Sequence, residues 1–279
     1  MNRNIVILLI LLPSIVWPVN RHFGIADKSL SVADCSINNT AFGDNEHLVY
    51  QIYYNWGLIW LNVGQAVFHV NETKDGYYIN AVGDTYSSYE WLFNVYDQFE
   101  VMVDKSTLMP KWSVKKVREN GYKRYEKKIF NQEGKSVMSY AGPDINHLTK
   151  KTVSVNECTQ DILSALYFVR NYQFQNYSKG KSFDLNIFMD DRNYYLPARF
   201  DGFFNHKDVK GLGTFNTIRL SPATVPGQVF SSASGSHIYA SNDANKIPLM
   251  IEAKLTVGSI KVILQSAKNL RNPFISRVK

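Results

Sequence analysis

Apolar and polar side chains alternate in short runs from residue 47 onward, and this period of two constrains the fold more than any other feature. Residues 48–54 are rich in Val, Ile and Tyr, and residues 65–70 place Ala66, Phe68 and Val70 on one face. Successive side chains of a strand point to opposite faces of a sheet. Such runs therefore predict half-buried β-strands.

Short turn sequences separate these runs. Asp75-Gly76, Asn120-Gly121 and Glu133-Gly134 are typical of tight hairpins. Strands joined by such short connections must be antiparallel. The further runs of this kind are residues 77–82, 98–103, 111–118, 122–130, 135–140, 182–189, 194–204, 213–220 and 247–264.

One segment follows a helical period instead. Residues 159–172 carry apolar side chains at helical spacing. Thr159 is the expected N-cap, and Asp161 places a carboxylate in the first turn. Residues 87–93 allow a second, short helix.

Near the C-terminal end of the expected helix, Arg170 carries a positive charge where the helix dipole favours one. Its side chain is also long enough to reach a carboxylate on a neighbouring strand, and Asp243 and Glu252 are the expected partners. Loss of Arg170 should then lower stability.

Together these patterns predict an all-β fold with one packed α-helix. The expected architecture is a large, strongly curved antiparallel sheet that approaches a half-barrel, whose concave face the helix, loops or a ligand must fill. A closed β-sandwich is the alternative. No Pro-, Gly- or Ser-rich linker divides the chain. Residues 42–266 are therefore expected to form a single domain, after an N-terminal arm at 27–41 and before a basic tail at 267–279.

The first residues are typical of an exported protein. Arg3 precedes an apolar run at residues 5–19, which contains Pro13 and Pro18 and is too short to span a bilayer comfortably. We expect a signal peptide at residues 1–26, with an uncleaved N-terminal anchor as the alternative. No later stretch is apolar enough to predict a transmembrane span in the mature chain.

The chain contains 2 cysteines, Cys35 and Cys158. In an oxidising compartment they are expected to form a disulfide that ties the N-terminal arm to the middle of the fold. Two buried, unpaired thiols are the alternative. So few cysteines exclude an all-cysteine zinc site and an iron–sulfur cluster.

The charge balance bears on partners. The chain has 31 basic and 24 acidic side chains, a formal net charge of +7. The basic tail concentrates Lys268, Arg271, Arg277 and Lys279, which predict a solvated segment or, alternatively, a weak contact with an anionic surface. Basic residues elsewhere alternate with acidic ones, so nucleic acid is not expected as a partner.

No catalytic signature is present. The motifs G-x-S-x-G, H-E-x-x-H and G-x-x-x-x-G-K-[ST] are absent, and the 6 histidines lack the spacing of metal ligands. Asp190-Asp191 is the only adjacent carboxylate pair and is typical of a turn. The sequence therefore predicts no catalytic residue, metal or cofactor.

Aromatic residues are abundant, with 17 Tyr, 16 Phe and 5 Trp. Aromatic side chains commonly fill sheet interiors, so a plain core is one interpretation. The other is that some line an apolar pocket. The candidate ligand-binding residues are Trp56, Trp60, Trp91, Phe93 and Tyr96, of which Trp91 and Phe93 are expected to be the more exposed pair.

Several segments resemble a known family. Residues 46–54, Gly57 and residues 63–66 are similar to the first hairpin of the bacterial exported family named domain of unknown function 3108. Further matches are residues 95–99, 108–110, 161–170, 213–217, 248–252 and 257–259. The resemblance covers residues 42–266.

The N-terminal arm with Cys35 is similar to that of Bacteroidetes members, which implies export to the periplasm or the outer membrane of a Gram-negative bacterium. The family has no established activity, so the resemblance implies no catalytic residue. The expected half-barrel is similar in shape to the periplasmic lipoprotein carriers of the LolA/LolB type, an analogy of fold alone. It favours a binding module for an apolar or amphipathic molecule such as a lipid. An envelope scaffold without a small ligand and an enzyme of unknown reaction are the alternatives.

Overall fold

The structure is a computed structural model, and it describes residues 35–56, 59–91, 93–223 and 235–278. The expected signal peptide at residues 1–26 lies outside the described residues. So do the first part of the N-terminal arm and Lys279 of the basic tail.

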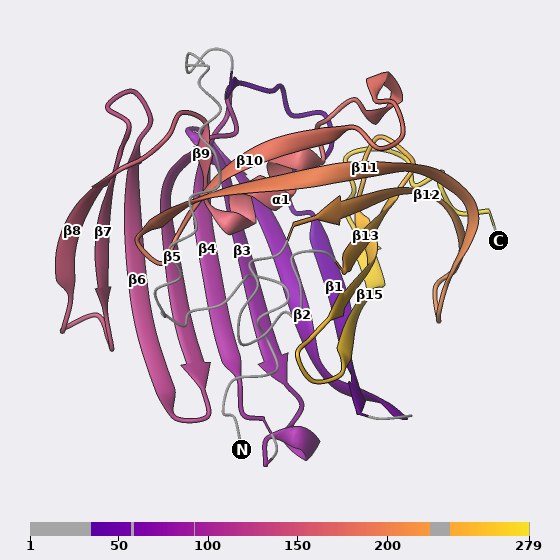
Figure 1. Cartoon of the computed structure of the whole chain (residues 1–279), viewed down its shortest axis with the longest axis horizontal. Helices are drawn as coiled ribbons and strands as arrows, with labels where there is room; N and C mark the ends of the chain where they lie inside the picture. The colour runs from indigo at the N-terminus through magenta and orange to yellow at the C-terminus, as the bar shows by residue number, and fades with distance from the viewer. Residues whose placement is uncertain (1–34, 57–58, 92, 224–234, 279) are drawn as a thin grey trace.

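Antiparallel strands dominate the fold and form one 15-stranded sheet (Figure 1). Their order across the sheet is β8-β7-β6-β5-β4-β3-β2-β1-β15-β14-β13-β12-β11-β10-β9. The strands are β1 (His47–Trp56), β2 (Ile59–Thr73), β3 (Gly76–Thr85), β4 (Tyr96–Asp104), β5 (Pro110–Glu119), β6 (Tyr122–Asn131), β7 (Ser136–Gly142), β8 (Thr149–Ser154), β9 (Thr159–Gln160), β10 (Ser182–Met189), β11 (Arg192–Val209), β12 (Gly213–Pro222), β13 (Ser236–Ser241), β14 (Pro248–Lys254) and β15 (Ser259–Lys268). The prediction of an all-β fold with one α-helix is confirmed, and the sheet is open rather than a closed sandwich.

The alternation of side chains explains which face of the sheet is buried. Val70 of β2 pairs with Ile79 of β3, and Ile79 pairs with Val101 of β4. All three side chains are fully buried on the concave face. A one-residue slip would turn this row outward, so burial fixes the register.

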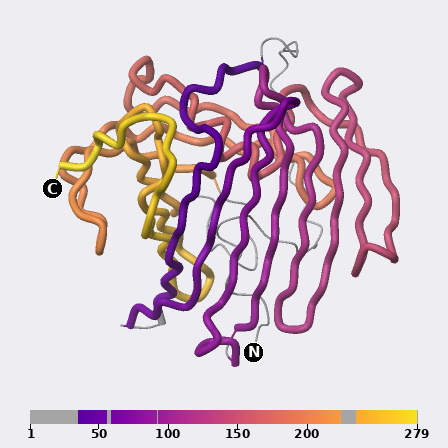
Figure 2. The backbone as a smooth tube through the Cα atoms, turned by 180° about the vertical axis from the view of Figure 1, so that it is seen from behind, coloured from indigo at the N-terminus to yellow at the C-terminus, as the bar shows by residue number. Residues whose placement is uncertain are grey.

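The sheet curls until its second half faces its first. Figure 1 shows β10 and β11 crossing in front of the strands β1 to β6, and Figure 2 shows β1 to β8 as one curved wall from behind. The rings of Phe130 in β6 and Phe188 in β10 lie 6.3 Å apart, although these strands are far apart in the sheet order. Irregularities in strand register, such as the one between Phe200 and Gly202 of β11, increase the local bend.

The helix α1 (Ile162–Val169) fills part of the space between the two halves and packs on β3, β4 and β10. It begins later than predicted. Asp161 is the N-cap and accepts a hydrogen bond from the backbone N–H of Leu163, and Ser164 completes a capping box. Thr159 lies in β9 instead, where it pairs with Asn186 of β10, and its hydroxyl donates to the backbone carbonyl of Asn156.

The expected disulfide is confirmed: Cys35 and Cys158 are bonded, with Cα atoms 5.2 Å apart. The bridge places the N-terminal arm beside the segment that leads into α1. At the other end of the helix, the side-chain oxygen of Asn171 accepts hydrogen bonds from the backbone N–H groups of Thr40 and Ala41. The arm is therefore fixed to both ends of the helix.

Some strand predictions were wrong. Residues 247–264 form two strands, β14 and β15, because Gly258 has a φ of +77° and closes a turn in which the Leu255 N–H donates to the Gly258 carbonyl. The strands β8, β9 and β13 were not predicted. β8 carries Lys150 and Lys151 and is mostly exposed, so it lacks the apolar alternation of a half-buried strand.

The helical turns η2 (Ser87–Tyr89) and η3 (Phe174–Asn176) are single 3₁₀ turns. The first confirms the short helix that residues 87–93 allow. Among the described residues, no helix is long and apolar enough to cross a membrane.

Candidate functional site

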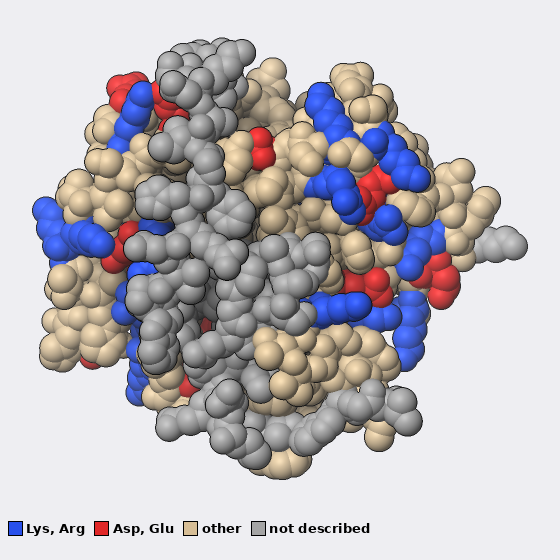
Figure 3. Space-filling view, viewed as in Figure 1, with Lys and Arg blue, Asp and Glu red and all other residues tan. Residues whose placement is uncertain are grey.

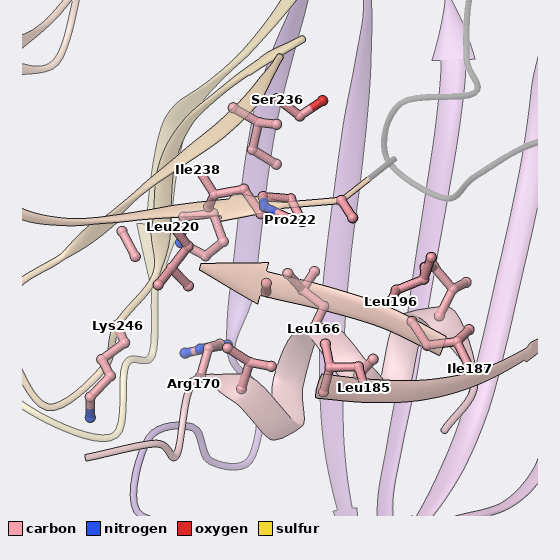
Figure 4. A pocket seen from close by; sticks show the side chains of 18 of the residues that line it. Leu166, Arg170, Leu185, Ile187, Leu196, Leu220, Pro222, Ser236, Ile238 and Lys246 are labelled. Carbon is pink, nitrogen blue, oxygen red and sulfur yellow. The ribbon is translucent and has the colours of Figure 1, made fainter. Parts of the chain in front are cut away.

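An apolar cavity of about 190 Å³ lies between α1 and the strands β10 to β15 (Figure 4). Leu166 on the helix faces Leu185, Ile187 and Leu196 of the neighbouring strands in this view. The other apolar residues that line the cavity are Phe68, Ile162, Ala165, Val169, Phe174, Phe183, Ala198, Leu220, Pro222, Ala223, Ile238, Ala240, Pro248, Ile251, Ala253 and Val262.

The cavity exists because small side chains occupy inward positions on both of its walls. Ala165 lies on α1, and Ala198, Ala240 and Ala253 lie on β11, β13 and β14. All four are buried. A leucine at any of these positions would place three more carbon atoms in the space. The alternation of the strands aims these residues inward, and their small size leaves the space empty.

One end of the cavity is bounded by a buried ion pair. The guanidinium of Arg170 donates to the carboxylate of Glu46 at 2.6 and 2.8 Å, and the two side chains are 3% and 0% exposed. Arg170 also donates to the backbone carbonyls of Asn245 and Ala41. Burial alone would lower the pKa of Arg170, but the charge of Glu46 outweighs this and raises it. The cation is therefore satisfied within the protein.

The predicted partners of Arg170 were wrong. Glu252 pairs with Lys261 at 2.9 Å on the outer face, and the carboxylate of Asp243 accepts hydrogen bonds from Ser241 and the backbone of Asn245.

Lys246 borders the same end of the cavity. It is 6% exposed, and burial lowers its pKa while the nearby Asp243 opposes the shift. Figure 4 shows its ammonium pointing away from the other lining residues, so its aliphatic stem is the part that lines the cavity. Tyr50 lines the cavity too, and burial raises the pKa of its phenol. It is therefore neutral at physiological pH.

A second group of buried polar residues lies on the concave face of β5 and β6. Lys128 pairs with Glu126 at 2.9 Å, and Lys115 pairs with Asp190, beside the end of β10, at 3.1 Å. Burial would raise the pKa of Glu126, but the charges of Lys128 and Lys115 lower it. The gap beside Lys115 and Lys128 measures about 10 Å³, enough for about one water molecule. The charges neutralise one another and leave no room for a substrate.

Next to this cluster, the buried Asp97 of β4 and the half-buried Glu119 of β5 form a carboxyl pair. Desolvation and the charge of Glu119 raise the pKa of Asp97, and desolvation also raises the pKa of Glu119. The backbone N–H of Arg118 donates to Asp97 at 3.0 Å. Two neighbouring carboxylates withdrawn from water cannot both be ionised at low cost, so the pair retains a proton.

Ser221, His237 and Asp201 lie together on the outer face of β11 to β13. The Ser221 hydroxyl donates to Asp201 and lies 2.9 Å from His237 Nδ1, and this same ring nitrogen lies 3.9 Å from Asp201. A catalytic triad needs the two ring nitrogens to face different partners, with histidine accepting the serine proton. In this protein the same ring nitrogen of His237 faces both Ser221 and Asp201, so the three residues do not form a triad.

The cluster around Asp201 serves to balance charge. Burial would raise the pKa of Asp201, but hydrogen bonds from Ser221 and Arg199 lower it. Arg199 and Arg219 lie 2.7 and 2.9 Å from its carboxylate. Basic side chains with acidic ones among them gather over this face in Figure 3. Within the described ranges, no group of three or more His, Cys, Asp or Glu residues is placed to hold a metal.

Of the aromatic residues predicted to bind a ligand, the four whose side chains the structure describes, Trp60, Trp91, Phe93 and Tyr96, do not line the cavity. Trp60 and Tyr96 are exposed at strand ends, and Trp91 is 79% exposed with its indole N–H donating to the Ser88 carbonyl. Phe93 is half-buried against Tyr54, so the expectation that Trp91 and Phe93 are the more exposed pair holds for Trp91 and is wrong for Phe93. Trp56 lies in β1, and its side chain is outside the described part of the structure.

Sequence reasoning missed the residues that do line the cavity. The signal that could have found them is alanine at inward positions of the alternating strands, as at Ala198, Ala240 and Ala253, together with Ala165 on the helix face. Alanine is common in protein cores, so inward alanines indicate a cavity only when the distance between the facing walls is already known.

The fold and the cavity define an incompletely closed β-barrel that encloses an apolar space beside one short helix. The family model described as protein of unknown function DUF3108 matches residues 49–265, and the chain belongs to this family. No curated protein matches the chain.

Two solved structures are similar to this chain. One is a β-barrel-like protein of the domain of unknown function DUF1849 from Brucella abortus, with a TM-score of 0.56 and 12% identity over 84% of this chain and 99% of that one. It supports the fold alone. The other is a Bacteroides fragilis protein of YmcC-like fold, described as exported, with a TM-score of 0.31 and 11% identity over 84% of this chain and 100% of that one. A TM-score of 0.31 is too low to support a conclusion about the fold of this chain.

Proposed function

We propose that this protein is an exported binding module that holds an acyl chain, or a similarly slender apolar group, of an amphipathic envelope molecule. The observation that carries the proposal is the apolar cavity of about 190 Å³ between α1 and β10 to β15. An apolar cavity of about 150 Å³ stays dry and accepts a benzene ring. The cavity therefore suits one chain segment rather than a bulky lipid body.

The polar groups around the cavity support an apolar occupant. Arg170 is neutralised by Glu46, and the Lys246 ammonium points away from the lining. A charged ligand group placed in the cavity would lose its hydration without gaining a free partner. The polar part of an amphipathic ligand should therefore remain outside.

Export is supported by two observations. The N-terminal sequence is typical of a signal peptide, and the Cys35–Cys158 disulfide requires an oxidising compartment to persist. The periplasm or outer membrane of a Gram-negative bacterium is the compartment we propose.

The test is the binding of a fluorescent fatty acid to the mature protein, measured by titration without membranes. Ala165→Leu and Ala240→Leu, on opposite walls, should each weaken binding about tenfold or more, since the space for the chain is removed. Ala141→Leu is the matched control, because Ala141 is a half-buried residue of β7 outside the cavity. Unchanged affinity in both cavity variants, with their fold intact, would reject the proposal.

A further inference from the structure

Exposed apolar side chains gather at one end of the barrel. The chain reverses at this end between β1 and β2, β3 and β4, β5 and β6, and β14 and β15. The first two of these reversals lie at the bottom of Figure 1. We name as the apolar rim the exposed residues at these four reversals, Ile59, Trp60, Trp91, Tyr96, Tyr122 and Val257.

Contacts between neighbouring reversals make the apolar rim continuous. The Tyr54 hydroxyl donates to the Val257 carbonyl at 3.2 Å, which joins the β14–β15 turn to β1. The ring of Tyr54 also packs on Phe93 in the connection between β3 and β4. Asn94 and Asn120 exchange hydrogen bonds, which join that connection to the β5–β6 turn. The rim is therefore held as one surface.

The composition of the apolar rim matches the interface of a lipid bilayer. Trp and Tyr favour the headgroup level of membranes, where one part of the ring is apolar and another is wet. Among the described residues, three exposed cationic side chains lie beside these reversals, and they are Arg118, Lys123 and Lys254. Glu90 is the one exposed carboxylate there. This excess of positive charge is complementary to anionic headgroups.

The apolar rim also lies next to one end of the cavity. Ser236 of β13 pairs with Ala253 of β14, and the next residue, Lys254, pairs with Ser259 at the β14–β15 turn. Figure 4 shows Ser236 and Pro222 at the opposite end of the lining from Arg170 and Lys246. The Ser236 end of the lining therefore lies on the side of the apolar rim.

We infer that the apolar rim docks on the surface of an anionic phospholipid bilayer, with its rings at headgroup level and its cations on the lipid phosphates. This interaction goes beyond the proposed function, because it needs no occupant in the cavity. It gives the protein a fixed orientation on the membrane, with the Ser236 end of the cavity toward the lipid.

The experiment is flotation of the mature protein with vesicles of phosphatidylethanolamine and phosphatidylglycerol. Ile59→Ser and Trp91→Ala should each lower the apparent partition coefficient about tenfold, since an exposed side chain that would enter the interface is removed. Ile275→Ser is the matched control, because Ile275 is 74% exposed and Ile59 is 63% exposed. Ile275 lies in the C-terminal segment beside the start of β12, at the other end of the barrel. It should bind as the parent does.

A charge reversal tests the electrostatic part. Lys254→Glu at the rim should weaken binding severalfold, whereas Lys268→Glu at the far end of β15 should not. Vesicles of phosphatidylcholine alone should bind the parent protein more weakly than the anionic vesicles.

The inference is overturned if the parent protein does not float, or if the rim variants and Ile275→Ser change binding equally. Self-association that Ile59→Ser abolishes, with vesicle binding unchanged, would assign the rim to a second copy of the chain and also overturn it. The fatty-acid titration keeps the two proposals separate. Ile59→Ser should retain acyl binding, and Ala240→Leu should retain flotation.

Discussion

Replacing Arg170 with alanine should destabilise the protein by about 3–5 kcal/mol, because it leaves a buried carboxylate without its cation. Glu46 is 0% exposed, and its two oxygens accept from Arg170 at 2.6 and 2.8 Å. The guanidinium also lies 5.0 Å from the ring of Tyr167 and 5.5 Å from that of Phe42, so packing is lost together with charge. The value of about 3–5 kcal/mol counts only the buried charge that loses its partner and does not include the lost packing.

The assay is urea unfolding of the parent, of Arg170→Ala, of Glu46→Gln, of Arg170→Met and of the double variant Glu46→Gln with Arg170→Met. Each single variant should lose several kcal/mol, and the double variant should lose less than their sum, because no buried charge then lacks a partner. Fatty-acid titration of Arg170→Met separates stability from binding. The reasoning is refuted if Arg170→Ala costs less than about 1 kcal/mol, or if the two single losses simply add.

Three further results are expected. Replacing Cys35 and Cys158 with serine should lower the free energy of unfolding by about 5 kcal/mol, the value of the chain-entropy model for a sequence separation of 123. Thiol titration of the denatured, unreduced parent protein should find no free thiol. The pKa of Asp97 is raised by burial to about 8, so the folded protein keeps a proton that the unfolded chain releases near pH 4. Stability should therefore fall as the pH rises from about 4 to about 8, and Asp97→Asn should flatten this dependence in unfolding curves, whereas an unchanged slope would contradict it. Gly258→Ala should lower the melting temperature more than Gly121→Ala, although both glycines have a positive φ. A Cβ atom at Gly258 would lie 2.4 Å from the Asn55 carbonyl oxygen, whereas a Cβ atom at Gly121 would meet nothing within 4 Å.

Local pattern was enough to predict most of the sheet. The inward row of Val70, Ile79 and Val101 comes directly from alternation, and tight turns gave the antiparallel order. Alternation of apolar and polar residues did not predict the strands correctly where a strand is mostly exposed or where a turn lies within the alternating run. β8 is polar and mostly exposed, and the alternation of apolar and polar residues continues through the turn at Gly258, so it hides the break between β14 and β15.

The candidate site was harder to predict, because it depends on residues far apart in sequence. Arg170 and Glu46 are separated by 124 positions, and nothing local distinguishes Glu46 from Asp243 or Glu252. Aromatic residues attracted attention as binding groups, yet the cavity results from small residues such as Ala240 that leave space on facing walls. Sequence shows which side chains are present but not which space remains unfilled.

The anchors of α1 explain how this space persists. A helix of 8 residues is not stable alone in water, so tertiary contacts must hold it in place. Its N-terminal side is fixed by the Cys35–Cys158 bridge and the Asp161 cap, and its C-terminal side by the Arg170–Glu46 pair. These two anchors oppose a movement of Ala165 toward the alanines of β11 and β13. The walls therefore stay apart, and the cavity between them persists.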